Sequence, residues 1–242
     1  MRIKRRAVRS TSRRSGWHSA FKNVLIGAGV FVAVLVLAGS SFLYYVLLKE
    51  LPSIAALKDY RPSLATRVYS DNNELVDEFF AEDRKIIPYA EVPKIVIQAF
   101  VAAEDARFFH HKGFDLQSIT RAFYKNLEAG KIVQGGSTIT QQVAKLLYLS
   151  PEKSYLRKIK EAILAYKIDT YLTKEEILHL YLNHIYLGHG TYGIEAAAEA
   201  YFGKSSRHLT LSEAAILAGL PKAPTTYSPY VNYERARQRQ AY

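Results

Sequence analysis

Residues 104–115 read EDARFFHHKGFD, and they connect two predicted helices. Before them, PKIVIQAFVAAEDA predicts a helix over 93–106 that begins at a proline, a residue favoured at the first helical position. After them, Asp115 can cap a helix that ends at Gly130, because aspartate accepts hydrogen bonds at a helix start and glycine suits a helix end. The apolar side chains of this second helix share one face: Leu116, Ile119, Phe123 and Leu127.

Helical patterns continue through the rest of the chain. They predict helices over 137–149, 155–171 and 193–202, with Ser137 as the cap of the first. Thr173 and Thr210 each precede a glutamate by three residues, which is the capping-box pattern of two further helix starts. The helix over 155–171 carries one apolar stripe, made of Leu156, Ile159, Ile163 and Tyr166.

The residues before this helical region have a different pattern. Residues 67–80 alternate around Asp71-Asn-Asn73, which predicts a short hairpin. The expected fold is therefore mainly α, with a short N-terminal β-hairpin.

The first fifty residues predict a membrane anchor. Residues 1–22 hold eight Lys or Arg and no acidic residue, and residues 24–48 carry no charge. Roughly 20 apolar residues span a bilayer, so this run can cross it once. Ala38-Gly39-Ser40 could imitate a signal-peptide cleavage site, but the apolar run continues beyond it and favours an uncleaved anchor.

Charge bias sets the expected topology. A cationic flank stays in the cytoplasm, so everything after residue 49 is expected outside the inner membrane as a single-pass type II protein. The tail supplies +8 of the net charge of +11 and leaves only +3 for the exported part, which argues against a nucleic-acid partner. The chain has no cysteine, so the exported part relies on its core rather than on disulfides.

Residues 104–115 also carry candidate chemistry. Glu104 and Asp105 stand beside the cation Arg107 and the aromatic Phe108, and a carboxylate in such surroundings is a candidate general acid or base. A charged helix end that runs into a turn would have the same composition, so this stretch alone leaves both interpretations open.

Two later stretches favour anion binding. QGGSTITQQVAK at 134–145 gathers hydroxyl and amide side chains at a helix start, where exposed N–H groups attract anions, and Lys145 follows two turns later. RKIKE at 157–161 places two cations around Glu161 on one helix face. A solvated helix with ion pairs four residues apart would look the same, and the alternative is a cationic cradle for a diphosphate.

Together these motifs resemble the peptidoglycan glycosyltransferases of glycosyltransferase family 51, found in class A penicillin-binding proteins and monofunctional transglycosylases. The first is Glu104-Asp105-x-x-Phe108-x-x-His111-x-Gly113, the second GSTITQQVAK at 136–145, and the third RKIKE at 157–161. KEEILHLYLN at 174–183 resembles the fourth, and LSEAAILAGLP at 211–221 the fifth. Five motifs in family order are a specific signal.

The resemblance implies a lysozyme-like, two-lobed domain that polymerises lipid II into β-1,4 glycan with release of undecaprenyl diphosphate. By resemblance Glu104 is the general base and Glu161 the second catalytic carboxylate. The side chains expected to hold diphosphate and sugar are Lys145, Arg157, Lys158, Ser137, Thr138, Gln141 and Gln142. Supporting roles fall to Asp105, Phe108, His111, Gly113 and Asn183.

The resemblance also sets expectations for cofactors and partners. No cofactor is required, and no metal is held tightly; at most Mg²⁺ or Mn²⁺ accompanies the diphosphate. The partners are lipid II, the growing glycan chain, the bacterial inner membrane and other cell-wall synthesis proteins, with the catalytic domain on the periplasmic face. Two rivals stay open: a lysozyme-like lytic transglycosylase, and an inactive membrane-anchored scaffold.

The expected domain organisation has five parts. They are a basic tail (1–23), the anchor (24–48), a connector with the hairpin (49–80), the glycosyltransferase domain (81–233) and the start of a truncated linker toward a transpeptidase domain (234–242). Ser-x-x-Lys and Ser-x-Asn patterns starting at Ser19, Ser150 and Ser70 imitate transpeptidase motifs by chance, and no Lys-Thr-Gly occurs. We therefore expect no transpeptidase activity from this chain.

Overall fold

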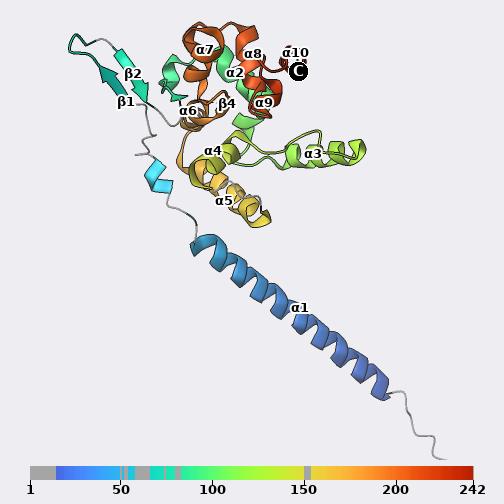
Figure 1. The fold of residues 1–242 in the computed structure, drawn as a ribbon. Coiled ribbons are helices and arrows are strands. Elements are labelled where there is room, and N and C mark those ends of the chain that lie inside the picture. Colours follow the sequence, from blue (N-terminus) through green and yellow to red (C-terminus); the bar gives the residue numbers. More distant parts are fainter. Residues whose placement is uncertain are drawn as a thin grey trace, which may run out of the picture. The chain divides into compact units, whose positions relative to one another are not determined.

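The computed structural model describes residues 15–49, 51, 54–57, 66–73, 75–79, 83–149 and 154–241. The chain divides into two compact units, Met1–Leu51 and Pro52–Tyr242 (Figure 1). Most of the predicted basic tail and the sequence around Ser150 lie outside the described residues.

The described residues of the first unit form helix α1 (Ser15–Lys49), followed by Leu51. Its stretch Phe21–Phe42 has a mean hydropathy of 2.3 and is long and apolar enough, by length and composition, to cross a membrane. The predicted anchor over 24–48 lies within this helix.

Two helix groups form the core of the second unit. Helix α2 (Lys94–Glu104) packs against α8 (Leu211–Gly219), and α4 (Ile139–Tyr148) packs against both α5 (Tyr155–Tyr171) and α6 (Lys174–His184). The largest fully buried side chains of these helices are Tyr181, Phe100, Ile139, Leu164, Ile168, Ile177, Leu178 and Leu182. The expectation of a mainly α fold is confirmed.

Most predicted helix starts are confirmed by their caps. Asp115 accepts a 3.0 Å hydrogen bond from the Gln117 backbone and opens α3 (Leu116–Ala129), and Gly130 ends that helix in the left-handed conformation at φ +61°. Both predicted capping boxes form, at Thr173 before α6 and at Thr210 before α8. The predicted short helix appears as α7 (Ile194–Phe202).

The apolar side chains of α3 and one apolar stripe of α5 are exposed, although such faces are usually buried in the core. Figure 1 shows α3 extending away from the other helices of its unit, and its apolar face is exposed by 41–68%. In α5 the apolar stripe that includes Leu156 and Ile159 is also largely exposed, whereas the buried residues are Glu161, Leu164, Ala165 and Ile168. The buried face of α5 therefore includes the carboxylate of the third motif.

The predicted hairpin forms from β1 (Thr66–Tyr69) and β2 (Leu75–Phe79), with a register shift between Val68 and Tyr69. A second sheet was not predicted. Its strands β3 (Asp83–Arg84), β5 (Thr191–Tyr192) and β4 (Tyr186–Gly188) lie in the order β3-β5-β4, and β3 runs parallel to β5. Strands of two or three residues carry too little alternation to be recognised in a sequence.

Short elements complete the second unit. They are the 3-10 helices η1 (Ile54–Leu57), η2 (Tyr89–Glu91), η3 (Phe108–His110) and η4 (Ser206–His208), and the helices α9 (Pro224–Tyr227) and α10 (Tyr233–Gln240). Helix α10 lies in the segment expected to begin a linker; it packs against α8 and α9 and buries Ala236.

Candidate active site

Glu104 is the last residue of α2, and its carboxylate faces the start of α4. Gln142 Nε2 donates a 2.8 Å hydrogen bond to Glu104 Oε2, and the Glu104 side chain is only 12% exposed. Burial raises the pKa of Glu104 above its ordinary value of 4.5, while the Gln142 hydrogen bond and the cations of Arg239 and Lys222 lower it. The site therefore holds a carboxylate with a raised pKa, as a general base requires.

The start of α4 is fixed by a capping box, and here the structure corrects the predicted cap. Thr138, not Ser137, is the N-cap: Thr138 Oγ1 accepts from the Gln141 backbone, and Gln141 Oε1 accepts from the Thr138 backbone. Because both side chains are at most 3% exposed, their polar atoms serve the fold. Thr138 borders the cleft, whereas the expected substrate contact of Gln141 is not supported.

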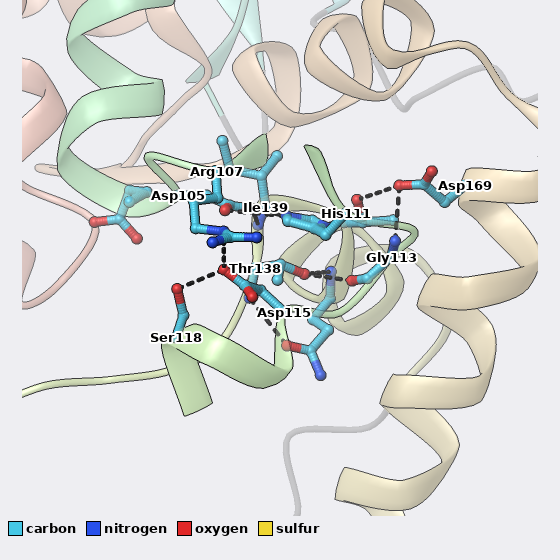
Figure 2. A network of polar contacts seen from close by, with 12 residues as sticks. Asp105, Arg107, His111, Gly113, Asp115, Ser118, Thr138, Ile139 and Asp169 are labelled. Atoms are coloured by element: carbon cyan, nitrogen blue, oxygen red, sulfur yellow. Dashed lines mark hydrogen bonds and ion pairs between the residues drawn. The ribbon is translucent and has the colours of Figure 1, made fainter. Parts of the chain in front are cut away.

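Asp105 attaches the loop after Glu104 to α4 (Figure 2). His111 Nε2 lies 3.0 and 2.9 Å from the two Asp105 oxygens, and Oδ2 also accepts a 3.0 Å hydrogen bond from the Ile139 backbone. Asp105 and His111 are both buried. Through these contacts the residue next to Glu104 is held to both the loop and the start of α4.

Asp169 on α5 holds the other end of the loop, and sequence reasoning missed it. Its Oδ2 accepts from the Gly113 backbone (2.9 Å), Thr140 Oγ1 (3.2 Å) and Lys174 Nζ (2.6 Å). Lys174 also donates to the His111 carbonyl, so one carboxylate links α4, α5, α6 and the loop. Asp169 lies outside the five motifs, and the sequence around it, AYKIDTY at 165–171, does not distinguish it from an ordinary polar residue of a helix.

Phe108 and Asn183, two further residues with expected supporting roles, do not line the cleft. Phe108 is fully buried, with Lys174 Nζ 4.5 Å from its ring centre. Asn183 exchanges hydrogen bonds with the backbone of Ile87, through Oδ1 at 2.9 Å and Nδ2 at 3.0 Å. Asn183 thereby ties the segment after β3 to α6.

Glu161 on α5 is the second carboxylate of the site, and it is 2% exposed. Arg157 Nη1 lies 3.3 Å from its Oε2, and Lys158 Nζ pairs with its Oε1. Lys158 Nζ also donates a 2.9 Å hydrogen bond to Ser137 Oγ. The cationic cluster predicted from RKIKE therefore forms, and it extends to the loop before α4.

A cleft of about 880 Å³ brings the two carboxylates together. Its lining includes most of the predicted site residues: Glu104, Asp105, Ser137, Thr138, Gln142, Lys145, Arg157, Lys158 and Glu161. It also includes five cations that sequence reasoning did not assign: Arg121, Lys125, Lys222, Arg235 and Arg239. These five come from α3, from the turn after α8 and from α10, so only the folded chain gathers them. The cleft is suited to a polyanionic ligand with a reacting group near Glu104.

Residues 72–242 match the family model described as Transglycosylase. The chain belongs to the transglycosylase family. The resemblance to the peptidoglycan glycosyltransferase domain of class A penicillin-binding proteins is thereby confirmed. Because the family match continues to residue 242, it includes helix α10.

The relatives of this transglycosylase domain are longer proteins. Penicillin-binding protein 1A of Neisseria flavescens is 49% identical over 80% of this chain and 24% of its own length. The protein of that name from Aquifex aeolicus is 47% identical over 90% of this chain and 30% of its own length. The crystal structure of penicillin-binding protein 1A from Haemophilus influenzae is 28% identical, with a TM-score of 0.38, and the match covers 75% of this chain and 17% of that one. The chain thus spans about a quarter of the length of the curated relatives it matches.

Proposed function

We propose that the chain polymerises lipid II into the β-1,4 glycan strands of peptidoglycan by inverting glycosyl transfer. The observation that carries the proposal is one cleft with a hydrogen-bonded carboxylate at Glu104 and a cationic cluster around Glu161. The first supplies a proton acceptor, and the second supplies the positive charge that a departing diphosphate needs.

In the proposed reaction Glu104 acts as the general base. The GlcNAc 4-hydroxyl of an incoming lipid II attacks the anomeric carbon of the growing chain and forms a new C–O bond there. The bond from that carbon to the diphosphate oxygen breaks, and its electron pair leaves with undecaprenyl diphosphate. The hydroxyl proton passes to Glu104, whose Oε2 is already held by Gln142 and whose Oε1 is therefore the oxygen suited to accept it.

Three other cations of the cleft stabilise the leaving group. Lys145 is exposed within the cleft, where its ammonium can contact a phosphate directly. Arg157 and Lys158 are held in place by the buried Glu161, so their charges are positioned before the diphosphate arrives. Ser137 Oγ, beside Lys158, is the hydroxyl best placed to contact phosphate or sugar oxygens.

A divalent cation fits this scheme only on the substrate. Among the residues that the structure describes, no three His, Cys, Asp or Glu side chains gather as a metal-binding group. Both Glu161 oxygens already face a cation from α5. Mg²⁺ or Mn²⁺ would thus be carried by the diphosphate, which is how Mg²⁺ commonly enters such sites.

The proposed location follows from the substrate. The lipid of lipid II stays in the bilayer, so the enzyme must remain near it, and α1 supplies a helix apolar enough to anchor the chain. We propose the bacterial inner membrane, with the catalytic domain on the periplasmic face, and other cell-wall synthesis proteins as partners.

The test is a polymerisation assay with the full chain in detergent and labelled lipid II. Wild type should form glycan, and Glu104→Gln should lose at least ~100-fold in rate, the lower range for removing a general base. Glu128→Gln, on an exposed position of α3, is the matched control and should keep the wild-type rate. Glu104→Gln should still bind moenomycin, a mimic of the donor diphosphate substrate. Retained binding would show that the lower rate does not come from a misfolded cleft.

Two results would contradict the proposal. If Glu104→Gln polymerises like wild type, Glu104 is not the base. If the chain shortens preformed glycan and makes none from lipid II, the lytic rival is correct. Lys145→Met tests the cations around the diphosphate separately, and it should lower the polymerisation rate at low lipid II concentration. An unchanged rate would show that Lys145 does not contact the substrate.

A further inference from the structure

Helix α10 forms part of the wall of the cleft. Asn232 caps it by accepting a 3.0 Å hydrogen bond from the Arg235 backbone, and Gln240 Nε2 near its end donates to the Ser212 carbonyl at 2.9 Å. The start of the helix is thus capped, and its end is hydrogen-bonded to α8, against which the helix packs. Its side chains Arg235, Gln238 and Arg239 line the cleft.

Arg239 is directed from α10 toward the carboxylate of Glu104. The two side chains are 11% and 12% exposed, and Arg239 Nη2 lies 4.0 Å from Glu104 Oε1. The path of its stem depends on Gly219: a Cβ atom at that position would lie 2.8 Å from Arg239 Cγ. The missing side chain of Gly219 therefore leaves the space in which the Arg239 stem lies.

The other groups around Glu104 come from four different places in the chain. Gln142 on α4 donates to Oε2, Lys222 after α8 adds a second positive charge, and Asp105 adds a negative one. Tyr181 on α6 stays neutral, since burial and then the charges of Glu104 and Asp105 raise its pKa well above 10.0. Arg239 is thus the nearest cation to a buried carboxylate that burial pushes toward its protonated form.

We propose that Arg239 is a positioning residue for the reaction: its guanidinium keeps the Glu104 carboxylate ionised and orients it between α10 and Gln142. This inference rests on the proposed function, in which Glu104 must accept a proton. A cation within 4–6 Å favours the ionised form of a carboxyl group, and the effect is strong where water is largely excluded. An arginine suits this task because it stays charged at any pH that the enzyme meets.

The first experiment is the pH profile of kcat/KM for glycan formation by the full chain in detergent, for wild type, Arg239→Gln and Arg239→Lys. In Arg239→Gln the acid limb should move to higher pH by roughly one pH unit or more, because the base loses its nearest cation. At high pH most of the wild-type rate should return. In Arg239→Lys the acid limb should stay close to its wild-type pH, because the positive charge is kept. Arg237 is exposed on the same helix, and Arg237→Gln should have the wild-type kcat/KM at every pH.

A uniform loss of rate at every pH, with the acid limb in its wild-type place, would overturn the inference and leave Arg239 with a structural role only. A rise in KM with kcat and the acid limb unchanged would also overturn it, and would make Arg239 a substrate contact.

A second measurement does not depend on activity. Infrared titration of the isotope-labelled carboxyl groups, with Glu104→Gln to identify the Glu104 band, follows its protonation directly. The midpoint for Glu104 should be higher in Arg239→Gln than in wild type, and equal midpoints would overturn the inference. If wild type makes no glycan from lipid II, the proposed function fails, while this titration still decides the role of Arg239.

Discussion

Replacing Gly113 by alanine should damage the domain far more than its small size suggests. Gly113 has φ +80°, and an added Cβ atom would lie 2.5–2.6 Å from the backbone of Ala165 and Tyr166 on α5. Backbone atoms of a packed helix cannot rotate away as the end of a side chain could. The loop that carries Asp105 and His111 would therefore have to move away from α5.

The expected loss of stability in Gly113→Ala has two parts. The left-handed conformation costs an alanine about 1–2 kcal/mol, and forcing an extra carbon into a packed interior costs about 1–3 kcal/mol more. Gly130→Ala isolates the first part, because Gly130 has φ +61° and no atom lies within 4 Å of its added Cβ. With about 2–4 °C of melting temperature per kcal/mol for a domain of this size, Gly113→Ala should melt roughly 2–12 °C below Gly130→Ala.

The assay is thermal unfolding of the full chain in detergent at one scan rate, followed by near-ultraviolet circular dichroism of the 18 tyrosines. Glycan formation should also fall in Gly113→Ala and stay close to wild type in Gly130→Ala, because the first moves the residues beside Glu104. Equal melting temperatures for the two variants would refute the reasoning, since the contact with α5 would then carry no cost.

Two further predictions concern stability. Burial lowers the pKa of His184 from 6.5 to about 4, so the unfolded chain binds a proton there more readily than the folded chain does. The free energy of unfolding should therefore fall by up to about 3 kcal/mol as pH drops from 6.5 to 4. Urea titrations should show this as a falling midpoint, and the midpoint of His184→Gln should fall less over the same pH range. Phe123→Ser, on the exposed face of α3, should change the free energy of unfolding by less than about 0.5 kcal/mol, whereas Leu164→Ala in the core should cost about 2–5 kcal/mol in the same urea titration.

The local signals of the sequence predicted the helices well. Asp115, Gly130, Thr173 and Thr210 end or begin helices where expected, because each acts on backbone groups only a few residues away. The cap of α4 moved from Ser137 to Thr138, since adjacent hydroxyl residues offer the same chemistry. The exposure of the α3 face could not be predicted, because the spacing of apolar residues shows which of them share a face but not whether another element packs against it.

The candidate site was predicted only in part. Glu104, Lys145 and the RKIKE cluster stand in recognisable motifs, and the structure places them around one cleft. Asp169 and Arg239 carry no motif, and their contacts join them to residues 56 and 135 positions away along the chain. Helix α10 lies where the start of a linker was expected, and its place in the lining of the cleft depends on its packing against α8 and α9.

The sequence by itself determined the helical character, the long apolar helix near the start of the chain and the family, because caps, hydrophobic runs and motifs act within short stretches of chain. The tertiary structure decided which charges meet. It buried Glu104 beside Gln142 and Arg239, joined three helices and a loop through Asp169, and turned the last helix into a wall of the cleft. Electrostatic effects depend on distance and burial, and both arise only when residues far apart in the chain pack together.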